Sequence, residues 1–157
     1  MRQLSASEQS DLERRKAQFD SFLAERMPVL TDFMKCLEFS DGEMVLVEAD
    51  RFLPALDEFM QNQEIDLDDR NWIMTRIGYF IGEWLVQRYG GCWFINESPE
   101  SPTFLRYVVG QFAGLSNPRA VVDPFQVADV FISQPPPRSL IQATDELEAE
   151  LQTAKIY

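Results

Sequence analysis

The segment from Arg70 to Tyr89 most constrains what this chain can fold into, because it lies in the longest proline-free span and ends at a pair of glycines. At about 100° per residue, its large apolar side chains gather on one broad face. These are Ile73, Ile77, Phe80, Ile81, Trp84 and Leu85. We predict a helix over residues 70–89 that is covered on most sides, with Glu83, Arg76 and Gln87 on a narrow polar strip.

Gly78 and Gly82 lie four residues apart within this predicted helix. Each costs roughly 1 kcal/mol of helix stability relative to alanine, so we expect close backbone approach by a neighbouring helix or strand there. A membrane span is excluded for this segment, because Arg76 and Glu83 interrupt an apolar run that would need about 20 residues.

Capping signals predict helices before the central segment. Ser5, followed three residues later by Glu8, is typical of a capping box and opens a helix over residues 6–26. Pro28 is expected to end or kink this helix, after which helical spacing resumes to about residue 37.

Residues 40–69 are expected to form a turn and a second helix. The run Met44–Val47 is either a short strand or the lead into a helix, and we favour the non-strand interpretation. Asp50 is a candidate cap for a helix over residues 51–62. Asp68 or Asp69 is placed to cap the central helix.

Three segments after the glycine pair have the composition of strands. Residues 92–96, 103–112 and 119–122 are separated by turn signals and predict a small antiparallel meander that packs against the central helix.

Two helix starts follow the predicted sheet. Asp123-Pro124 with Gln126 opens a helix to about residue 133, and Ser139 with Gln142 opens the last helix after a run of three prolines. Residues 1–157 therefore predict a single α+β domain. In it, N-terminal helices and a long central helix pack on an antiparallel sheet of about three strands, followed by two C-terminal helices.

The charge is strongly negative and unevenly distributed. The net charge is −12, and residues 38–69 contain eleven acidic side chains against one basic side chain. Such a field repels nucleic acid and anionic membrane surfaces and attracts a basic protein. The candidate partner-binding residues are Glu38, Asp41, Glu43, Glu48, Asp57, Glu58, Glu64, Asp66, Asp68 and Asp69. The alternative is a dispersed, solvated set of charges.

The residue types present exclude several classes of site. The chain has no histidine, which excludes Ser-His and Cys-His nucleophile arrangements and histidine-based metal sites. Cys36 and Cys92 are expected to be buried free thiols. Asp66, Asp68 and Asp69 invite a calcium interpretation, but the EF-hand spacing fails at Arg70 and Asn71, so helix capping is favoured. We expect no metal and no cofactor.

Glu83 is the one candidate for carboxylate chemistry. A carboxyl on an otherwise apolar helix can have a raised pKa and act with a second acid such as Asp123 in an enzyme or ligand-binding site. The simpler interpretation pairs Glu83 with an arginine such as Arg76 or Arg106, and it favours a protein that is not an enzyme.

Three runs of residues resemble a small bacterial domain family of unknown function. They are Gly78-Tyr79-Phe80-Ile81-Gly82-Glu83, Tyr89-Gly90-Gly91-Cys92-Trp93 and Val122-Asp123-Pro124-Phe125. The resemblance covers about residues 70–137, implies an α+β fold, and supplies no active residues. Some similar small bacterial proteins have immunity-type or accessory roles, an analogy at the level of fold alone.

These observations together favour a non-enzymatic bacterial interaction protein, immunity-like in role, that offers its acidic region to a basic partner. No apolar signal-peptide core opens the sequence and no segment is long enough to span a bilayer, so we expect a cytoplasmic location.

Overall fold

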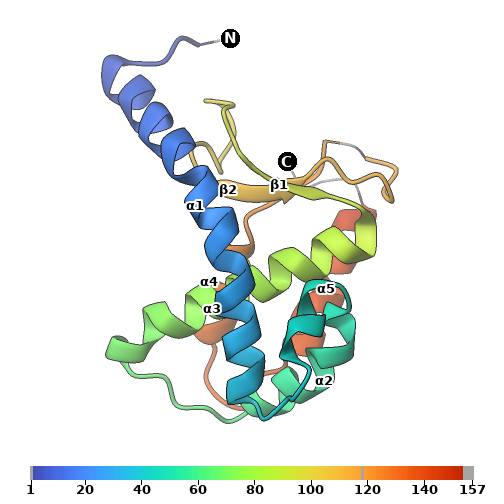
Figure 1. Cartoon of the computed structure of the whole chain (residues 1–157). Coiled ribbons are helices and arrows are strands. Elements are labelled where there is room, and N and C mark those ends of the chain that lie inside the picture. The colour runs from blue at the N-terminus through green and yellow to red at the C-terminus, as the bar shows by residue number, and fades with distance from the viewer. Residues whose placement is uncertain (1, 118, 154–157) are drawn as a thin grey trace.

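The computed structural model describes residues 2–117 and 119–153, in which five α-helices and a three-stranded antiparallel sheet form an α+β fold (Figure 1). The elements in chain order are α1 (Ala6–Cys36), the 3-10 helix η1 (Gly42–Leu46), α2 (Ala49–Met60), α3 (Leu67–Tyr89), β1 (Cys92–Ile95), β2 (Tyr107–Gly110), β3 (Val121–Val122), α4 (Pro124–Ile132) and α5 (Leu140–Gln152). The predicted fold class is confirmed.

The first helix is longer than predicted. The capping box is present, since the Ser5 hydroxyl accepts from the Glu8 backbone N–H and the Glu8 carboxylate accepts from the Ser5 N–H. Pro28 does not end the helix, which continues as α1 to Cys36. The turns after Pro28 bury Leu30, Phe33 and Met34 completely or nearly so, and this packing offsets the hydrogen bond that proline cannot donate.

The residues between α1 and α2 form a short 3-10 helix, which confirms the non-strand interpretation of Met44–Val47. Helix α2 begins two residues earlier than predicted, so Asp50 lies in its first turn and is not its cap. The Gln87 side chain of α3 supplies the missing contacts: its Oε1 accepts from the Ala49 N–H at 2.7 Å and its Nε2 donates to the Val45 carbonyl at 2.9 Å.

The central helix α3 is buried on all sides from Ile77 to Leu85, so the predicted cover is present there, whereas residues 67–72 are largely exposed. The helix ends at Gly90, which has the left-handed φ of 67°. Its N-cap position is Asp66, so the prediction that Asp68 or Asp69 caps it is wrong; both lie in the first turn. Aromatic rings fill the space over its glycines. A Cβ at Gly78 would lie 2.3 Å from the Phe125 ring, and one at Gly82 would lie 1.9 Å from the Trp93 ring. The prediction that a neighbouring backbone approaches here is therefore wrong, because aromatic side chains of α4 and β1 occupy the space.

The sheet has the predicted meander order, with β2 in the centre and both pairings antiparallel. Its strands are shorter than predicted. β2 starts only at Tyr107, because Leu105 has a left-handed φ of 71° and residues 102–105 form turns. α1 crosses one side of this sheet and α3 runs beneath it (Figure 1). Tyr107 fixes α1 in place by donating to the Arg15 carbonyl at 2.6 Å.

Both C-terminal helices start as predicted. The Asp123 carboxylate accepts from the Phe125 and Gln126 N–H groups, and the Ser139 hydroxyl accepts from the Gln142 N–H. Between these helices lies Arg138, a buried cation that the sequence did not single out. Its guanidinium donates to the carbonyls of Met60, Gln63 and Gln134, which ties the ends of α2 and α4 together.

The two cysteines are free, but the prediction that they are buried is wrong. Cys36 is the last residue of α1, and Cys92 occupies an outward position at the start of β1, where the alternate residue Trp93 points inward. The side chains of a strand alternate between its two faces, so β1 can bury only one of these neighbours on a given face.

Candidate functional site

Glu83 is buried in the structure, not on a polar strip. It is 3% exposed, and its Oε1 lies 2.8 Å from Nη1 of Arg26 on α1. Arg26 is thus its partner, in place of the expected Arg76 or Arg106. Burial raises the pKa of Glu83, and the charge and hydrogen bond of Arg26 oppose this shift without cancelling it.

The surroundings of Glu83 favour a buried ion pair over a site that is open to substrate. It lines none of the four main cavities of the described residues. A catalytic carboxyl needs access to substrate and a second group within hydrogen-bond reach of the reacting atoms. The contact with Arg26 instead joins α1 to α3 and favours a structural role.

Asp123 is held by other partners. Its Oδ1 caps α4, and its Oδ2 accepts from Nη1 of Arg106 at 2.9 Å. Both carboxylate oxygens are therefore engaged, and Asp123 and Glu83 belong to separate groups of contacts. The structure does not bring the two sequence candidates for acid–base chemistry into one hydrogen-bonded pair within its described residues.

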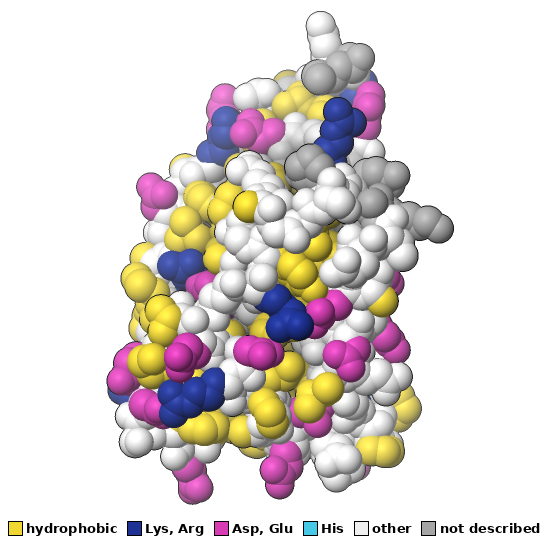
Figure 2. Space-filling view, turned by 90° about the vertical axis from the view of Figure 1, so that its right-hand side faces the viewer, with side chains coloured by type: hydrophobic (Ala, Val, Ile, Leu, Met, Phe, Trp, Pro, Cys, Tyr) yellow, Lys and Arg dark blue, Asp and Glu magenta, His cyan; other side chains and the backbone are white. Residues whose placement is uncertain are grey.

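Several acids of the 38–69 region are neutralised within the molecule. Arg51 pairs with Asp41 and with Glu48. Asp50 accepts from the Trp84 indole N–H at 3.0 Å, and its other oxygen lies 4.0 Å from Arg88. On the face shown in Figure 2, acidic side chains are widely spread and the few basic ones lie beside them.

Asp57 has a structural role. Its Oδ1 accepts from the Ser139 hydroxyl at 3.1 Å and from the Ile141 N–H at 3.0 Å. These donors stand at the start of α5, where backbone N–H groups have no partner within the helix. Asp57 therefore attaches α5 to α2 through its Oδ1 atom.

A second group of acids remains unpaired and gathers at the ends of α1, α2 and α3. One hollow is lined by Glu38, Glu58 and Glu64, and an adjoining hollow by Glu64, Asp68 and Asp69. The two hollows share Gln63 and Glu64. Within residues 2–117 and 119–153, none of these five carboxylates forms an ion pair.

Exposed aromatic side chains lie among these acids. Phe59 lines the first hollow and is 36% exposed, and Trp72 lines the second and is 44% exposed. Both rings make edge contacts with the buried Phe33, at centroid distances of 6.4 and 5.8 Å. We call the set Glu38, Glu58, Phe59, Glu64, Asp68, Asp69 and Trp72 the α2–α3 surface.

One cation lies at the edge of this surface. The Arg76 guanidinium stacks over the Trp72 ring, 3.9 Å from its centroid, and donates to the Trp72 carbonyl at 3.1 Å. Desolvation lowers the pKa of Arg76 from its ordinary value. Stacking of this kind stabilises the observed orientation of the exposed indole by about 0.5–1 kcal/mol.

The remaining acids of the region lie apart from these contacts. Glu43 is exposed in the first turn of η1, and Asp66 is exposed at the N-cap of α3, where its side chain makes no capping hydrogen bond. The described residues contain no group of three or more cysteine, aspartate or glutamate side chains arranged to hold a metal ion. Asp66, Asp68 and Asp69 thus stand at a helix start, where acids interact favourably with the helix dipole.

No protein-family model, curated protein or solved structure matches this chain. Within its described residues, the chain has no helix with the length and apolar character needed to cross a membrane.

Proposed function

We propose that this protein is a non-enzymatic interaction protein that binds a basic partner protein through the α2–α3 surface. The observation that carries the proposal is the convergence of five unpaired carboxylates on two adjoining hollows with exposed aromatic rings between them. A role of immunity type is the biological context that the resemblance of residues 70–137 suggests.

Charge supports a basic partner. The five carboxylates come from the loop after α1, from α2, from the loop after α2 and from the first turn of α3. A lysine or arginine of a partner would supply the countercharge that the chain itself does not. Such charge complementarity accelerates encounter and selects against acidic partners, and salt weakens it.

The aromatic rings supply the apolar part of the surface. Tryptophan and other aromatic residues dominate the energetics of protein interfaces when they are surrounded by polar groups. Trp72 and Phe59 already rest on the buried Phe33, so binding would order them at little entropic cost. A partner that places a basic side chain beside an apolar one matches both features.

Charge reversal tests the proposal. The triple variant E38K/E58K/E64K changes three acids of the α2–α3 surface and leaves the first turn of α3 intact. Its matched control is E13K/D20K/D145K, which changes the net charge equally at exposed acids elsewhere. Each protein would be used to capture partners from its host, with the captured proteins identified and then purified for calorimetry.

The expected result is a basic partner bound by the wild-type protein and by the control triple. E38K/E58K/E64K should bind it at least about a hundredfold more weakly, as for the loss of several complementary charges. Equal binding by all three proteins, or equal loss in both triples, would exclude the α2–α3 surface as the binding site.

A further inference from the structure

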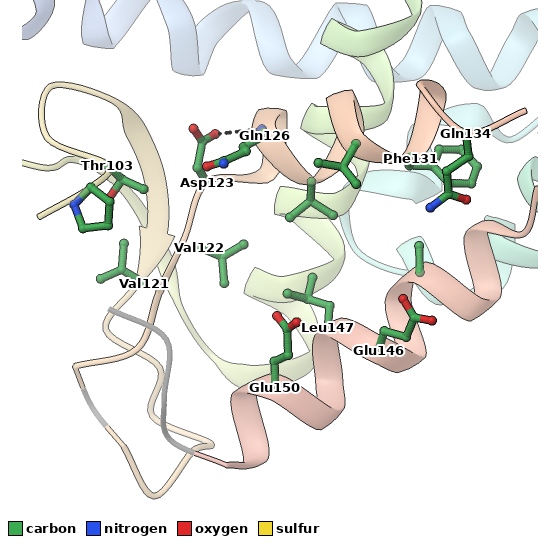
Figure 3. A pocket seen from close by; sticks show the side chains of 14 residues that line it. Thr103, Val121, Val122, Asp123, Gln126, Phe131, Gln134, Glu146, Leu147 and Glu150 are labelled. Carbon is green, nitrogen blue, oxygen red and sulfur yellow. Dashed lines mark hydrogen bonds between the residues drawn. The ribbon is translucent and has the colours of Figure 1, made fainter.

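A separate cavity of about 590 Å³ lies between the edge of the sheet, α4 and α5 (Figure 3). Residues of four segments line it: Thr103 before β2, Val121 and Val122 of β3, and residues of α4 and of α5. This volume is within the range of about 300–1,000 Å³ that small-molecule sites occupy. The cavity shares no residue with the α2–α3 surface.

The walls of this α4–α5 cavity are largely apolar. Its lining includes Val122, Val127, Phe131 and Leu147, and also Val130, which is 58% exposed. Covering apolar walls that are open to water with an apolar group is favourable, because it removes apolar surface from water. The part of a ligand that enters between α4 and α5 should therefore be hydrocarbon or aromatic.

The described charged groups that line the cavity all have one sign. Among residues 2–117 and 119–153, its lining contains Asp123, Glu146 and Glu150 and no lysine or arginine. Arg106 already compensates Asp123. Glu146 accepts only a neutral hydrogen bond, from the Gln142 amide at 3.1 Å, and neither it nor Glu150 has an ion pair among the described residues.

Glu146 and Glu150 also stand four residues apart on α5 and rise from it toward α4 (Figure 3). Like charges at this spacing repel one another along a helix. A cation placed between them would remove the repulsion and form charge-assisted hydrogen bonds. An anionic ligand would meet only repulsion here.

From this combination we infer that the α4–α5 cavity binds a small organic cation, with an ammonium group at Glu146 and Glu150 and an apolar body against Val127, Val130 and Leu147. This site is independent of the proposed protein-binding surface.

The first test uses four ammonium probes on the whole chain: butyl-, hexyl-, octyl- and phenethylammonium. Two further probes share the phenethyl body, the neutral 2-phenylethanol and the anionic 3-phenylpropionate. Binding would be followed by calorimetry and by chemical-shift changes of the amides of α4 and α5. At least one ammonium probe should bind saturably at a single site. Its affinity should be at least about tenfold higher than that of the neutral probe or of the anionic probe.

Variants then locate the site. E150Q should weaken ammonium binding at least about fivefold, and V130S should weaken it more for octyl- than for butylammonium. The matched control D145N removes one charge from α5 at an exposed residue outside the cavity and should bind as the wild type does. E38K/E58K/E64K should also bind the ammonium probes normally.

Three results would overturn the inference. One is that no ammonium probe shows saturable binding at concentrations up to about 10 mM, because a specific site would bind at least one probe with a lower dissociation constant. Another is equal affinity for phenethylammonium and 2-phenylethanol. The third is an equal loss of affinity in E150Q and D145N, which would assign the effect to the general charge of α5.

Discussion

At the scale of single residues, Glu83 and Arg26 form an unequal pair. The Glu83 side chain is 4% exposed, whereas the Arg26 side chain is 26% exposed. The arginine Nε has no hydrogen-bond partner among the described residues. The carboxylate therefore bears most of the desolvation, and its pKa is raised for that reason.

A raised carboxyl pKa has a defined effect on stability. Between the ordinary pKa of 4.5 and the raised value, the folded protein holds a proton at Glu83 that the unfolded chain has lost. The free energy of unfolding must then fall as pH rises through this window. The isosteric variant E83Q lacks this titration, so the wild type should lose stability relative to E83Q as pH rises.

Urea unfolding of both proteins from pH 4 to pH 8 measures this difference. The wild-type value minus the E83Q value should decrease with pH and level off above the raised pKa. A difference that rises with pH would show that the ion pair with Arg26 outweighs the burial of the carboxylate.

Gly82 is the second residue whose side chain we expect to determine stability, because α3 has no room for a Cβ atom there. An added methyl group would overlap the Trp93 ring, which is itself enclosed by Phe22, Tyr79 and Phe125. G82A should therefore lower the free energy of unfolding by about 2–3 kcal/mol, despite a gain of roughly 1 kcal/mol in helix propensity.

The matched variant is G78A. Its added methyl would meet the ring of Phe125, which is only half-buried and has more room to move. We expect a smaller loss for G78A in the same urea titration. A G82A protein as stable as the wild type would show that Trp93 can leave its place over α3 at no cost.

At the scale of elements, Asp57 and Arg138 hold the C-terminal helices to α2. The Asp57 carboxylate satisfies donors at the start of α5, and the Arg138 guanidinium satisfies carbonyls at the ends of α2 and α4. Desolvation lowers the pKa of Arg138 from its ordinary value. The negative Asp57 lies at the positive start of a helix, and the positive Arg138 lies at the negative ends of two helices, so both side chains interact favourably with the helix dipoles.

Neighbouring substitutions in α2 separate anchoring from binding. D57A removes the acceptor at the start of α5 and should cost about 1–2 kcal/mol of unfolding free energy. E58A changes the adjacent exposed acid. It should leave the free energy of unfolding within about 0.5 kcal/mol of the wild-type value and should weaken binding of the proposed basic partner. If E58A were as destabilising as D57A, the assignment of Asp57 as the anchoring residue would be wrong.

The Arg138 contacts have their own test. R138M keeps the apolar stem and leaves three carbonyl groups without their donor, so we expect a loss of about 2–4 kcal/mol in unfolding free energy. R14M is the control, because Arg14 is exposed and pairs only with Asp11 on the same helix. Equal stability of the two variants would mean that water replaces the guanidinium.

Three of the predicted helix caps, which depend on contacts local in sequence, are confirmed, whereas the caps predicted at Asp50 and at Asp68 or Asp69 are wrong. The capping box at Ser5 and the caps at Asp123 and Ser139 depend on residues within three positions of each, and all three are present. The β-branched and aromatic run from residue 103 predicted too long a strand, because propensity does not register the turn at Leu105.

Pairings between distant residues were not predictable in this way. Arg26 and Glu83 lie 57 residues apart, with nothing in the sequence to prefer Arg26 over Arg76 or Arg106. Arg138 follows three prolines and precedes the helix cap Ser139, a position typical of an exposed loop arginine. Its burial depends on how the ends of α2 and α4 pack together. The acids of residues 38–69 were recognisable as a group, but their division into paired, anchoring and unpaired members requires the fold.

At the scale of the whole molecule, the net charge of −12 acts against the compact state wherever acids are unpaired. Salt screens this repulsion, with a Debye length of about 10 Å at 0.1 M. Raising NaCl from about 0.05 M to about 0.5 M should therefore increase the urea unfolding free energy by about 0.5–1 kcal/mol.

The neutral variant E38Q/E58Q/E64Q should respond to salt less than the wild type does, because three of the repelling charges are gone. E13Q/D20N/D145N is the matched control and should keep more of the wild-type response. An equal response in both variants would mean that the acids of the α2–α3 surface repel one another no more than dispersed acids do.

The three tryptophans differ in a way that gives this molecule a built-in optical reporter. Trp84 and Trp93 are 2% and 7% exposed, whereas Trp72 is 44% exposed and stands among carboxylates. Collisional quenching of native-state emission should therefore come almost entirely from Trp72. Relative to free tryptophan in the same buffer, the negative potential should increase quenching by caesium ions and decrease quenching by iodide. A bound basic protein should remove this difference, which can be followed without any added label.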